Sequence, residues 1–213
     1  MRMTKKKKKP AKNMEVRQQV KDSKFYGSIF HVADRKEAEQ RISEIKEKYS
    51  DATHNVSAFR VETDGEKQEA LEYFDDDGEP AGSSGPPVLE AIKGANLLNT
   101  VIIVTRYFGG TKLGIGGLIR AYGDTASLAI KEAGVEVLSE FYKINVKSSF
   151  DKIGIVLGQL ESYKAEINET NYNNQGAVVK AVINTDILDK LKSSLKKKTG
   201  NEYNLEVEKS IFK

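Results

Sequence analysis

The amino-acid sequence predicts a mixed α+β protein built from two domains. The chain has 213 residues, which is long for one small domain and sufficient for two. Strand and helix patterns follow one another through its first part. Residues 139–213 then carry patterns in the order βαββαβ, the order of a ferredoxin-like split βαβ domain. We therefore expect one domain at 14–138 and a second, ferredoxin-like domain at 139–213.

The first residues form a basic run that predicts a tail. Seven of the 34 basic residues lie within residues 1–12, which hold no acidic residue. The remaining 27 basic residues face 31 acidic ones, so the rest of the chain carries a formal charge of −4. A lysine run such as Lys5–Lys9 repels itself and buries little, which predicts a disordered tail over 1–13. Such a tail either contacts phosphates without sequence specificity or is simply solvated.

Composition excludes several classes of protein. The chain has no cysteine, so it has no disulfide, no thiolate zinc site and no cysteine nucleophile. Hydrophobic residues make up 38%, which is enough to form a core. No apolar run approaches the ~18 residues that a membrane span needs, and the basic start lacks the apolar segment of a secretory signal. These features predict a cytoplasmic protein.

The first domain shows alternating strand and helix signals. Apolar residues alternate in three segments that predict strands, at 24–32, 55–61 and 68–74. Asp34, with Glu37 three residues later, is typical of a capped helix start. The unbroken β-branched run at 101–104 predicts a strand covered on both faces.

A glycine-rich loop lies between that buried strand and a predicted helix at 118–133. Five glycines fall within residues 109–117, where backbone N–H groups can closely approach a ligand. Serines and prolines at 83–87 predict a second helix start. A helix N-terminus favours an anion, and Arg106, Lys112 and Arg120 lie nearby in the sequence, so phosphate is the expected ligand. The alternative is that the glycines only shape a tight strand-to-helix crossover.

The sequence does not match the known phosphate-binding and metal-binding motifs. Ile115 stands where a P-loop has its lysine, and Ile119 stands where the dinucleotide fingerprint has its last glycine, so neither an NTP nor an NAD cofactor is predicted. The aspartates at 75–77 are simplest as an exposed turn. His31 and His54 lack the spacing of a metal pair, and no metal is predicted. No serine lies in a Gly-x-Ser-x-Gly elbow.

Three sequence segments together are similar to the signature of a known protein family. The combination resembles the IMPACT (YigZ) family over residues 14–138, and residues 139–213 resemble the small C-terminal domain of its bacterial YigZ-type members. The segments are Ala-Thr-His-Asn at 52–55, DDGEPAGSSG at 76–85 and RYFGGTKLGIGGLIRAYG at 106–123.

The resemblance implies a fold and a class of partner. It implies a ribosomal-protein-S5 domain-2-like fold for the first domain, as in the fourth domain of elongation factor G, and a second domain resembling that factor's fifth domain. Both likenesses imply RNA or the ribosome as partner, and eukaryotic relatives regulate translation. The expected anion or nucleic-acid site comprises His54, Glu79, Ser83, Ser84, Gly85, Arg106, Gly109, Gly110, Lys112, Gly114, Gly116, Gly117 and Arg120. His54 is alternatively a hydrogen-bonded structural histidine.

Three functions stay open at this point. The first, which we favour, is a non-enzymatic binding protein that contacts RNA or the ribosome through the glycine loop. The second is an enzyme or small-anion sensor in which His54, Arg106 and residues 78–85 line one cleft. The third is a protein-interaction adaptor with a partner in translation control. No catalytic residue or cofactor is assigned, and the sequence does not determine the oligomeric state.

Overall fold

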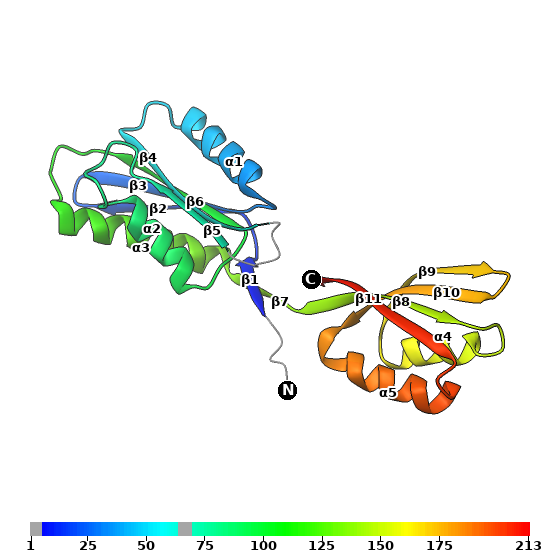
Figure 1. Ribbon diagram of the computed structural model, residues 1–213. Coiled ribbons are helices and arrows are strands. Elements are labelled where there is room, and N and C mark those ends of the chain that lie inside the picture. The colour runs from blue at the N-terminus through cyan, green and yellow to red at the C-terminus, as the bar shows by residue number, and fades with distance from the viewer. Residues whose placement is uncertain (1–5, 64–69) are drawn as a thin grey trace. The chain divides into compact units, whose positions relative to one another are not determined.

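A computed structural model describes residues 6–63 and 70–213 (Figure 1). The chain forms two compact units, one over Lys7–Val137 and one containing Leu138–Lys213. We call them the N-terminal and C-terminal units. Each has an apolar core of its own, and both mix helices with antiparallel strands. The α+β class predicted from the sequence is therefore confirmed.

The N-terminal unit is built on a five-stranded antiparallel sheet in the order β2-β3-β6-β4-β5. The central strand β6 lies between β3 and β4, and every residue of β6 except the last is buried. The predicted buried strand at 101–104 is part of it. The bounds are β2 Met14–Val20, β3 Ser23–His31, β4 His54–Glu62, β5 Ala70–Asp75 and β6 Thr100–Tyr107.

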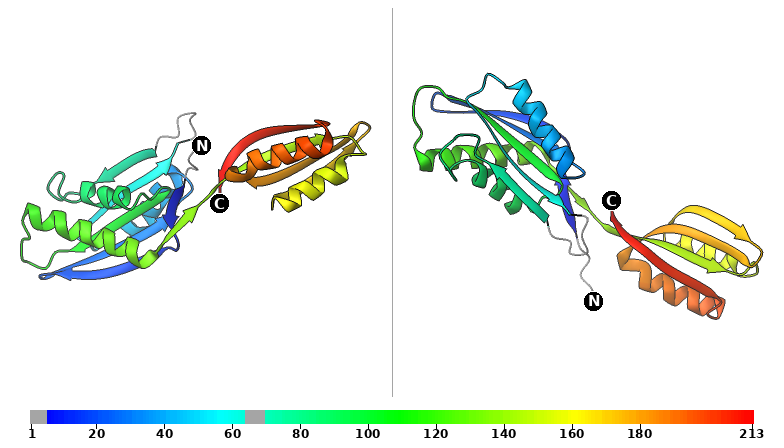
Figure 2. Two further views of the ribbon diagram at one scale, coloured as in Figure 1. Left: turned by 90° about the horizontal axis from the view of Figure 1, so that it is seen from below. Right: turned by 45° about the horizontal axis from the view of Figure 1, so that its top comes forward.

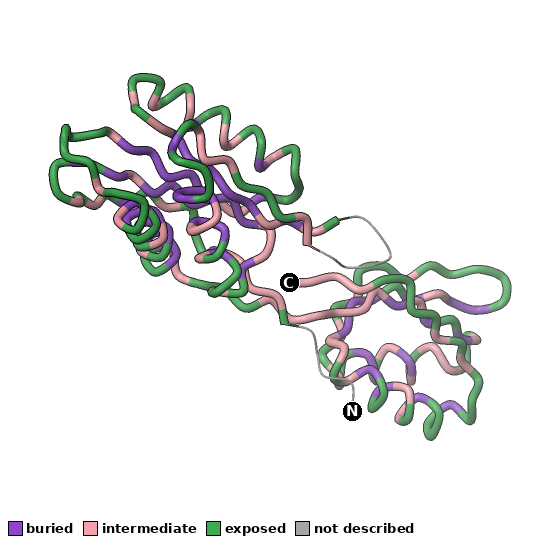
Figure 3. Tube along the Cα trace, turned by 60° about the vertical axis from the view of Figure 1, so that its left-hand side comes forward, coloured by how far each residue is buried: buried purple, intermediate pink, exposed green. Residues whose placement is uncertain are grey.

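Helices cover both faces of this sheet (Figures 1 and 2). Helices α2 (Gly85–Gly94) and α3 (Ile115–Ala133) pack on one face, and α1 (Arg35–Lys48) packs on the other. The buried residues run along the strands between these layers (purple in Figure 3). The predicted start of α1 is confirmed, because the Asp34 carboxylate accepts from the Glu37 N–H and Glu37 accepts from the Ala33 N–H.

One prediction about the first part of the chain needs correction. The predicted disorder is wrong from Lys7 onward, because β1 (Lys7–Pro10) pairs with β7 (Val135–Leu138). The Lys8 carbonyl accepts from the Leu98 N–H, and Lys9 pairs with Glu136 at 3.3 Å. These bonds offset the repulsion between neighbouring lysines. Strand β2 was not predicted, and the start of the strand predicted at 68–74 lies outside the described residues.

The C-terminal unit shows the βαββαβ order predicted from the sequence. Its four-stranded antiparallel sheet has the order β11-β8-β10-β9, and both helices pack their apolar stripes on one face (Figure 2). Across the described residues of both units, no helix is long and apolar enough to cross a membrane. The bounds are β8 Glu140–Ser148, α4 Ile153–Ser162, β9 Glu166–Asn173, β10 Gly176–Asn184, the 3-10 turn η1 Thr185–Ile187, α5 Leu188–Thr199 and β11 Tyr203–Phe212.

Candidate functional site

The side chain of Glu79 is a buried carboxylate that lies close to three other polar side chains of the N-terminal unit. Glu79 Oε1 accepts from Arg106 Nη1 at 2.6 Å and from the Tyr122 hydroxyl at 2.7 Å. His54 Nε2 lies 3.9 Å from the same oxygen. We call these four residues the Glu79 network. The structure therefore brings together three of the predicted site residues, His54, Glu79 and Arg106.

Strand register explains why these residues meet. His54 on β4 is the cross-strand partner of Arg106 on β6, and Phe25 on β3 is the partner of Arg106 on the other side. These three positions share the sheet face that packs against α2 and α3, because side chains alternate along each strand. Tyr122 comes down from α3 onto this face, with its ring edge-to-face against Phe25. The tertiary fold thus gathers the Glu79 network from β4, β6, α3 and the loop between β5 and α2.

Tyr122 was not predicted as a site residue. It lies in the buried stripe of α3 and has a fully buried side chain. A buried tyrosine usually needs a hydrogen-bond partner for its hydroxyl, and this rule could have indicated that Tyr122 contacts another polar residue. Burial, the negative charge of Glu79 and the hydrogen bond to that carboxylate raise the pKa of Tyr122 above its ordinary value. Its hydroxyl therefore stays protonated and donates to Glu79.

Arg106 is enclosed rather than open to solvent. The side chains of Arg106 and Glu79 are only 5% and 4% exposed. The guanidinium lies over the rings of Phe25 and Phe108, and its Nη2 donates to the Ser23 hydroxyl at 3.3 Å. Its Nε has no hydrogen-bond partner among the described residues. The positive charge of Arg106 is therefore matched internally by Glu79.

His54 is held by the aspartate turn. Its Nδ1 lies 2.8 Å from the Asp77 carbonyl oxygen, which can only accept, so Nδ1 donates and Nε2 faces Glu79. The Asp77 carboxylate accepts from the Asn55 N–H and pairs with Lys46 at 2.7 Å. The exposed turn predicted at 75–77 is only partly right, because Asp75 ends β5, the chain turns at Asp77 and Gly78, and all three aspartates are half-buried. Their carboxylates organise the surrounding chain instead of facing only solvent.

The start of α2 already binds an anion, and that anion is Asp76. Its carboxylate accepts from the backbone N–H groups of Gly82, Ser84 and Gly85 and from the Ser84 hydroxyl, at 2.6 to 3.1 Å. Ser83 donates its hydroxyl to the Pro80 carbonyl. Ser84 is the N-cap residue, but its side chain does not cap the helix. The donors predicted here for an external phosphate are therefore occupied.

This arrangement predicts a pH dependence. Burial alone would raise the pKa of Asp76, but the hydrogen bonds from Ser84, Gly82 and Gly85 outweigh burial and lower the pKa below its ordinary 3.8. A lowered folded-state pKa stabilises the fold above the ordinary pKa, and the stabilisation disappears as pH falls through the folded-state value. We expect Asp76→Asn to lower the free energy of unfolding by about 1 to 2 kcal/mol at pH 7.

The difference between wild type and Asp76→Asn should begin to shrink as the pH falls below the ordinary pKa of 3.8, and it should disappear only below the lowered folded-state pKa, where the Asp76 side chain is uncharged like asparagine. Urea unfolding at pH 7 and pH 3 measures it. A difference that stays constant over this range would contradict a role for the Asp76 charge.

The glycine loop is supported by the turn between β2 and β3. The Gly109 N–H donates to the Ser23 hydroxyl, which also accepts from Arg106, so this loop is linked to the Glu79 network. The Thr111 hydroxyl donates to the Asp22 carboxylate at 2.6 Å. A Cβ at Gly109 would lie 1.9 Å from the Asp22 carbonyl oxygen, so only glycine fits there. Gly110 has a φ of +96°.

The loop ends in an open helix start. Gly114, with φ +73°, is the N-cap of α3 and has no side chain to cap it. Within the described residues, neither Lys112 nor Arg120 forms an ion pair, and both are exposed. A Cβ at Gly116 would meet Arg120 Nη1 at 3.9 Å, so the guanidinium lies along the first turn of the helix. Gly116 is exposed and Gly117 is half-buried in the same turn.

The predicted site therefore divides into two parts with different properties. His54, Glu79, Ser83, Ser84, Gly85 and Arg106 bond to one another or to neighbouring chain. The loop at 109–117 with Lys112 and Arg120 faces outward. No group of three or more His, Cys, Asp or Glu residues among the described residues is arranged to hold a metal ion. What the arrangement can do chemically is bind an anion at an exposed, basic helix start.

The fold and site define a two-unit α+β protein in which a buried ion pair supports an exposed, basic glycine loop. Residues 21–130 match the family model described as the Impact N-terminal domain. The chain is 35% identical to "IMPACT family member YvyE" of Bacillus subtilis over 154 residues. The matched region covers 72% of this chain and 69% of the relative. The chain belongs to the IMPACT family.

Other relatives agree with this assignment, and one solved structure shares the fold. "IMPACT family member YigZ" of Escherichia coli is 32% identical over 58% of this chain and 59% of its own length. "Protein IMPACT" of Homo sapiens is 33% identical over 43% of this chain, which covers only 28% of that relative. A solved structure titled "Crystal structure of an hypothetical protein" shares the fold, with TM-score 0.63, 22% identity and coverage of 96% of this chain and 98% of its own.

Proposed function

We propose that this protein is a non-enzymatic, translation-associated binding protein that contacts RNA or the ribosome through the glycine loop at 109–117. One observation carries the proposal: the two helix starts differ. The α2 N–H groups are taken by Asp76, whereas α3 begins at a glycine cap beside two exposed cations, Lys112 and Arg120, that form no ion pair within the described part of the chain. Such a start attracts phosphate oxygens.

The fold supports a partner in translation. We infer that the N-terminal unit is S5 domain-2-like and that the C-terminal unit is ferredoxin-like. The strand order β11-β8-β10-β9 with the connectivity βαββαβ supports the second inference. Both folds occur in proteins of the translation machinery, and membership of the IMPACT family fits a role in translation control in the cytoplasm.

Three residues of the Glu79 network, Glu79, Arg106 and Tyr122, support binding over catalysis. A catalytic acid or base needs access to a substrate. Glu79 and Arg106 are almost fully buried and bond to each other, and Tyr122 donates to the same carboxylate. We infer that this network holds the start of the loop in place through Ser23, while the loop makes the contact.

The test reverses one charge on the loop. Lys112→Glu should weaken binding of the full chain to ribosomes or structured RNA by about ten- to thirtyfold, since attraction to phosphate becomes repulsion. The slope of log affinity against log salt should fall by about one unit. Filter binding and ribosome pelleting over a salt series measure both. The side chain is exposed, so melting should not change.

Lys36→Glu is the matched control, because Lys36 is an exposed lysine on α1, which packs on the opposite face of the sheet. It changes the net charge equally and should leave binding within about twofold. Equal losses in both variants would show that only net charge matters. Unchanged binding by Lys112→Glu would show that the loop is architecture.

A protein partner is the second candidate. Phe108, Ile115 and Ile119 lie at the loop and on the first turns of α3 and are 44%, 63% and 42% exposed, and exposed apolar side chains gathered in one region can mark a protein-binding surface. They would suit a partner protein at the same place. Purification of the tagged chain from lysate with and without nuclease distinguishes the two candidates, because a protein partner should remain after the RNA is digested.

A further inference from the structure

Helix α5 of the C-terminal unit is rich in lysine, and Asp189 is its only acidic residue. Within the part of the chain that the structure describes, none of these lysines forms an ion pair. We call them the α5 lysine face. The helix belongs to the layer that packs on one face of the sheet (Figure 1). Its 12 residues include five lysines, Lys190, Lys192, Lys196, Lys197 and Lys198, all exposed except the half-buried Lys192.

The lysine face is directed away from the core. Leu188, Leu191 and Leu195 are buried and belong to the core cluster of the unit. Residues seven positions apart share one side of a helix, so Lys190 and Lys197 lie together on the side opposite these leucines. They are separated by about 10 Å along the helix axis, because the rise is about 1.5 Å per residue. The helix therefore presents a row of positive charge rather than a single cation.

Helix stability explains only part of this pattern. Lys196, Lys197 and Lys198 lie in the last turn, where the helix dipole favours positive charge. Lys190 lies in the first turn, where the same dipole disfavours a cation. Lys192 and Lys196 are four residues apart, and like charges at this spacing destabilise a helix. The stability of the helix therefore does not account for the charges at Lys190 and Lys192.

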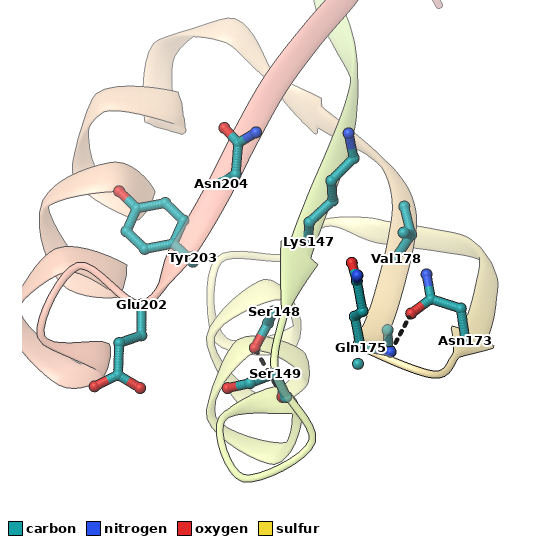
Figure 4. A pocket seen from close by; sticks show the side chains of 11 residues that line it. Lys147, Ser148, Ser149, Asn173, Gln175, Val178, Glu202, Tyr203 and Asn204 are labelled. Carbon is teal, nitrogen blue, oxygen red and sulfur yellow. Dashed lines mark hydrogen bonds between the residues drawn. The ribbon is translucent and has the colours of Figure 1, made fainter.

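The opposite face of the same sheet mixes charges of both signs. Lys147 pairs there with Glu206 at 3.0 Å, and Lys180 pairs with Glu169 at 2.8 Å. Lys147 also lines a hollow of about 390 Å³ at the end of the sheet, where Glu202 adds a negative charge (Figure 4). Unpaired positive charge in this unit is therefore concentrated on α5.

We propose that the α5 lysine face binds the phosphate backbone of an RNA duplex. Lysine ammonium groups contact phosphates as point charges and do not read sequence. Of the exposed large apolar residues in the described chain, none lies on α5, so the face offers no ring on which an unpaired base could stack. A duplex keeps its bases stacked and presents a high density of phosphates, which matches such a surface. The choice of RNA rests on the proposed function, whereas the phosphate contacts rest on α5 alone.

Two other kinds of partner match this surface less well. An amphipathic helix binds a membrane by inserting apolar side chains, and the leucines of α5 are buried in the core instead. Protein interfaces are depleted in lysine and enriched in arginine and aromatic residues, and α5 contains neither of the latter. The nucleic-acid backbone is therefore the ligand that a surface dominated by lysine favours.

The test removes two charges from the outer row of α5 in the full chain. Lys190→Gln combined with Lys197→Gln should weaken binding to a fluorescein-labelled RNA duplex of about 20 base pairs by about ten- to hundredfold at about 0.1 M salt, measured by anisotropy. The slope of log affinity against log salt should fall by about two units, one for each lost phosphate contact. Lys190→Arg combined with Lys197→Arg keeps both charges and should bind like wild type. Both side chains are exposed, so melting should not change.

Lys180→Gln combined with Lys209→Gln is the matched control. Both lysines are exposed, and strand register places them on the sheet face opposite α5. The control removes the same net charge and should change the slope by less than about half a unit. An equal loss in the control would overturn the proposal, because net charge alone would then suffice. An unchanged slope in the α5 variant, or a wild type that does not bind the duplex, would also overturn it.

Vesicles of equal parts phosphatidylcholine and phosphatidylserine test the membrane alternative by co-sedimentation. Wild type and the α5 variant should pellet with them to the same extent. If the α5 variant loses vesicle binding but keeps its affinity for the duplex, the proposal is overturned in favour of an anionic membrane.

Adding Lys112→Glu to the α5 variant separates this surface from the glycine loop. The losses of slope should add, to about three units in the combined variant. If Lys112→Glu binds like wild type while the α5 variant does not, the loop proposal fails and this one stands. The reverse result overturns this proposal and leaves the loop proposal in place.

Discussion

Replacing Glu79 by glutamine is expected to lower the free energy of unfolding by about 3 to 5 kcal/mol. The substitution keeps the shape of the side chain but removes the only charge that pairs with Arg106 among the described residues, at 2.6 Å. Because Arg106 stays protonated and is almost fully buried, its charge would remain uncompensated in the interior. Tyr122 would also lose a charged acceptor.

Amide hydrogen exchange of β6 under urea is the suitable measurement, since it reports on the N-terminal unit by itself. A double variant, Glu79→Leu with Arg106→Met, serves as the control for the mechanism. It should be more stable than Glu79→Leu alone, because removing both charges avoids the unpaired arginine. If the double variant is the less stable of the two, the penalty comes from lost packing rather than from an unpaired charge.

Gly109→Ala is expected to lower the free energy of unfolding by about 2 to 3 kcal/mol, while Gly116→Ala should leave it unchanged or slightly raised. A Cβ at Gly109 would lie 1.9 Å from the carbonyl oxygen and 2.1 Å from the carbonyl carbon of Asp22, both backbone atoms that cannot rotate away. At Gly116 the nearest atom is the flexible end of Arg120, at 3.9 Å. The two variants add the same methyl group to the same glycine-rich segment.

Thermal melting and binding assays should therefore distinguish the two variants. Gly109→Ala should weaken binding as well as stability, because the loop must move away from Asp22 and Ser23. Gly116→Ala tests whether a ligand closely approaches the first turn of α3. If both variants melt alike, the contact between the loop and the β2–β3 turn is not maintained in solution.

The two predictions link the buried and exposed parts of the site. Ser23 accepts from both Arg106 and the Gly109 N–H, so a single hydroxyl joins the Glu79 network to the loop. A substitution at Glu79 is therefore expected to alter the loop through Ser23, although it changes no residue of the loop itself. The segments 76–85 and 106–123 are separated in the sequence but contribute to one site. Glu79 in the first segment bonds to Arg106, which lies near the end of β6 and begins the second segment.

Several features could be predicted from the sequence because their causes are local. Alternation of apolar residues, the cap at Asp34, the β-branched run at 101–104 and the βαββαβ order all depend on neighbours within one element. These predictions agree with β3, α1, β6 and the C-terminal unit. The glycine loop was also placed between a buried strand and a helix, because glycines interrupt regular structure.

Only the tertiary structure decided what the polar residues do. Arg106 looked available to a ligand in the sequence, yet its partner Glu79 lies 27 residues away, in the loop between β5 and α2. The start of α2 looked open, yet Asp76 folds back onto it. The lysines of β1 looked disordered, yet β7 supplies their partner strand. Long-range pairing selects among partners that local patterns leave equivalent, so charge alone did not distinguish the buried Arg106 from the exposed Lys112 and Arg120.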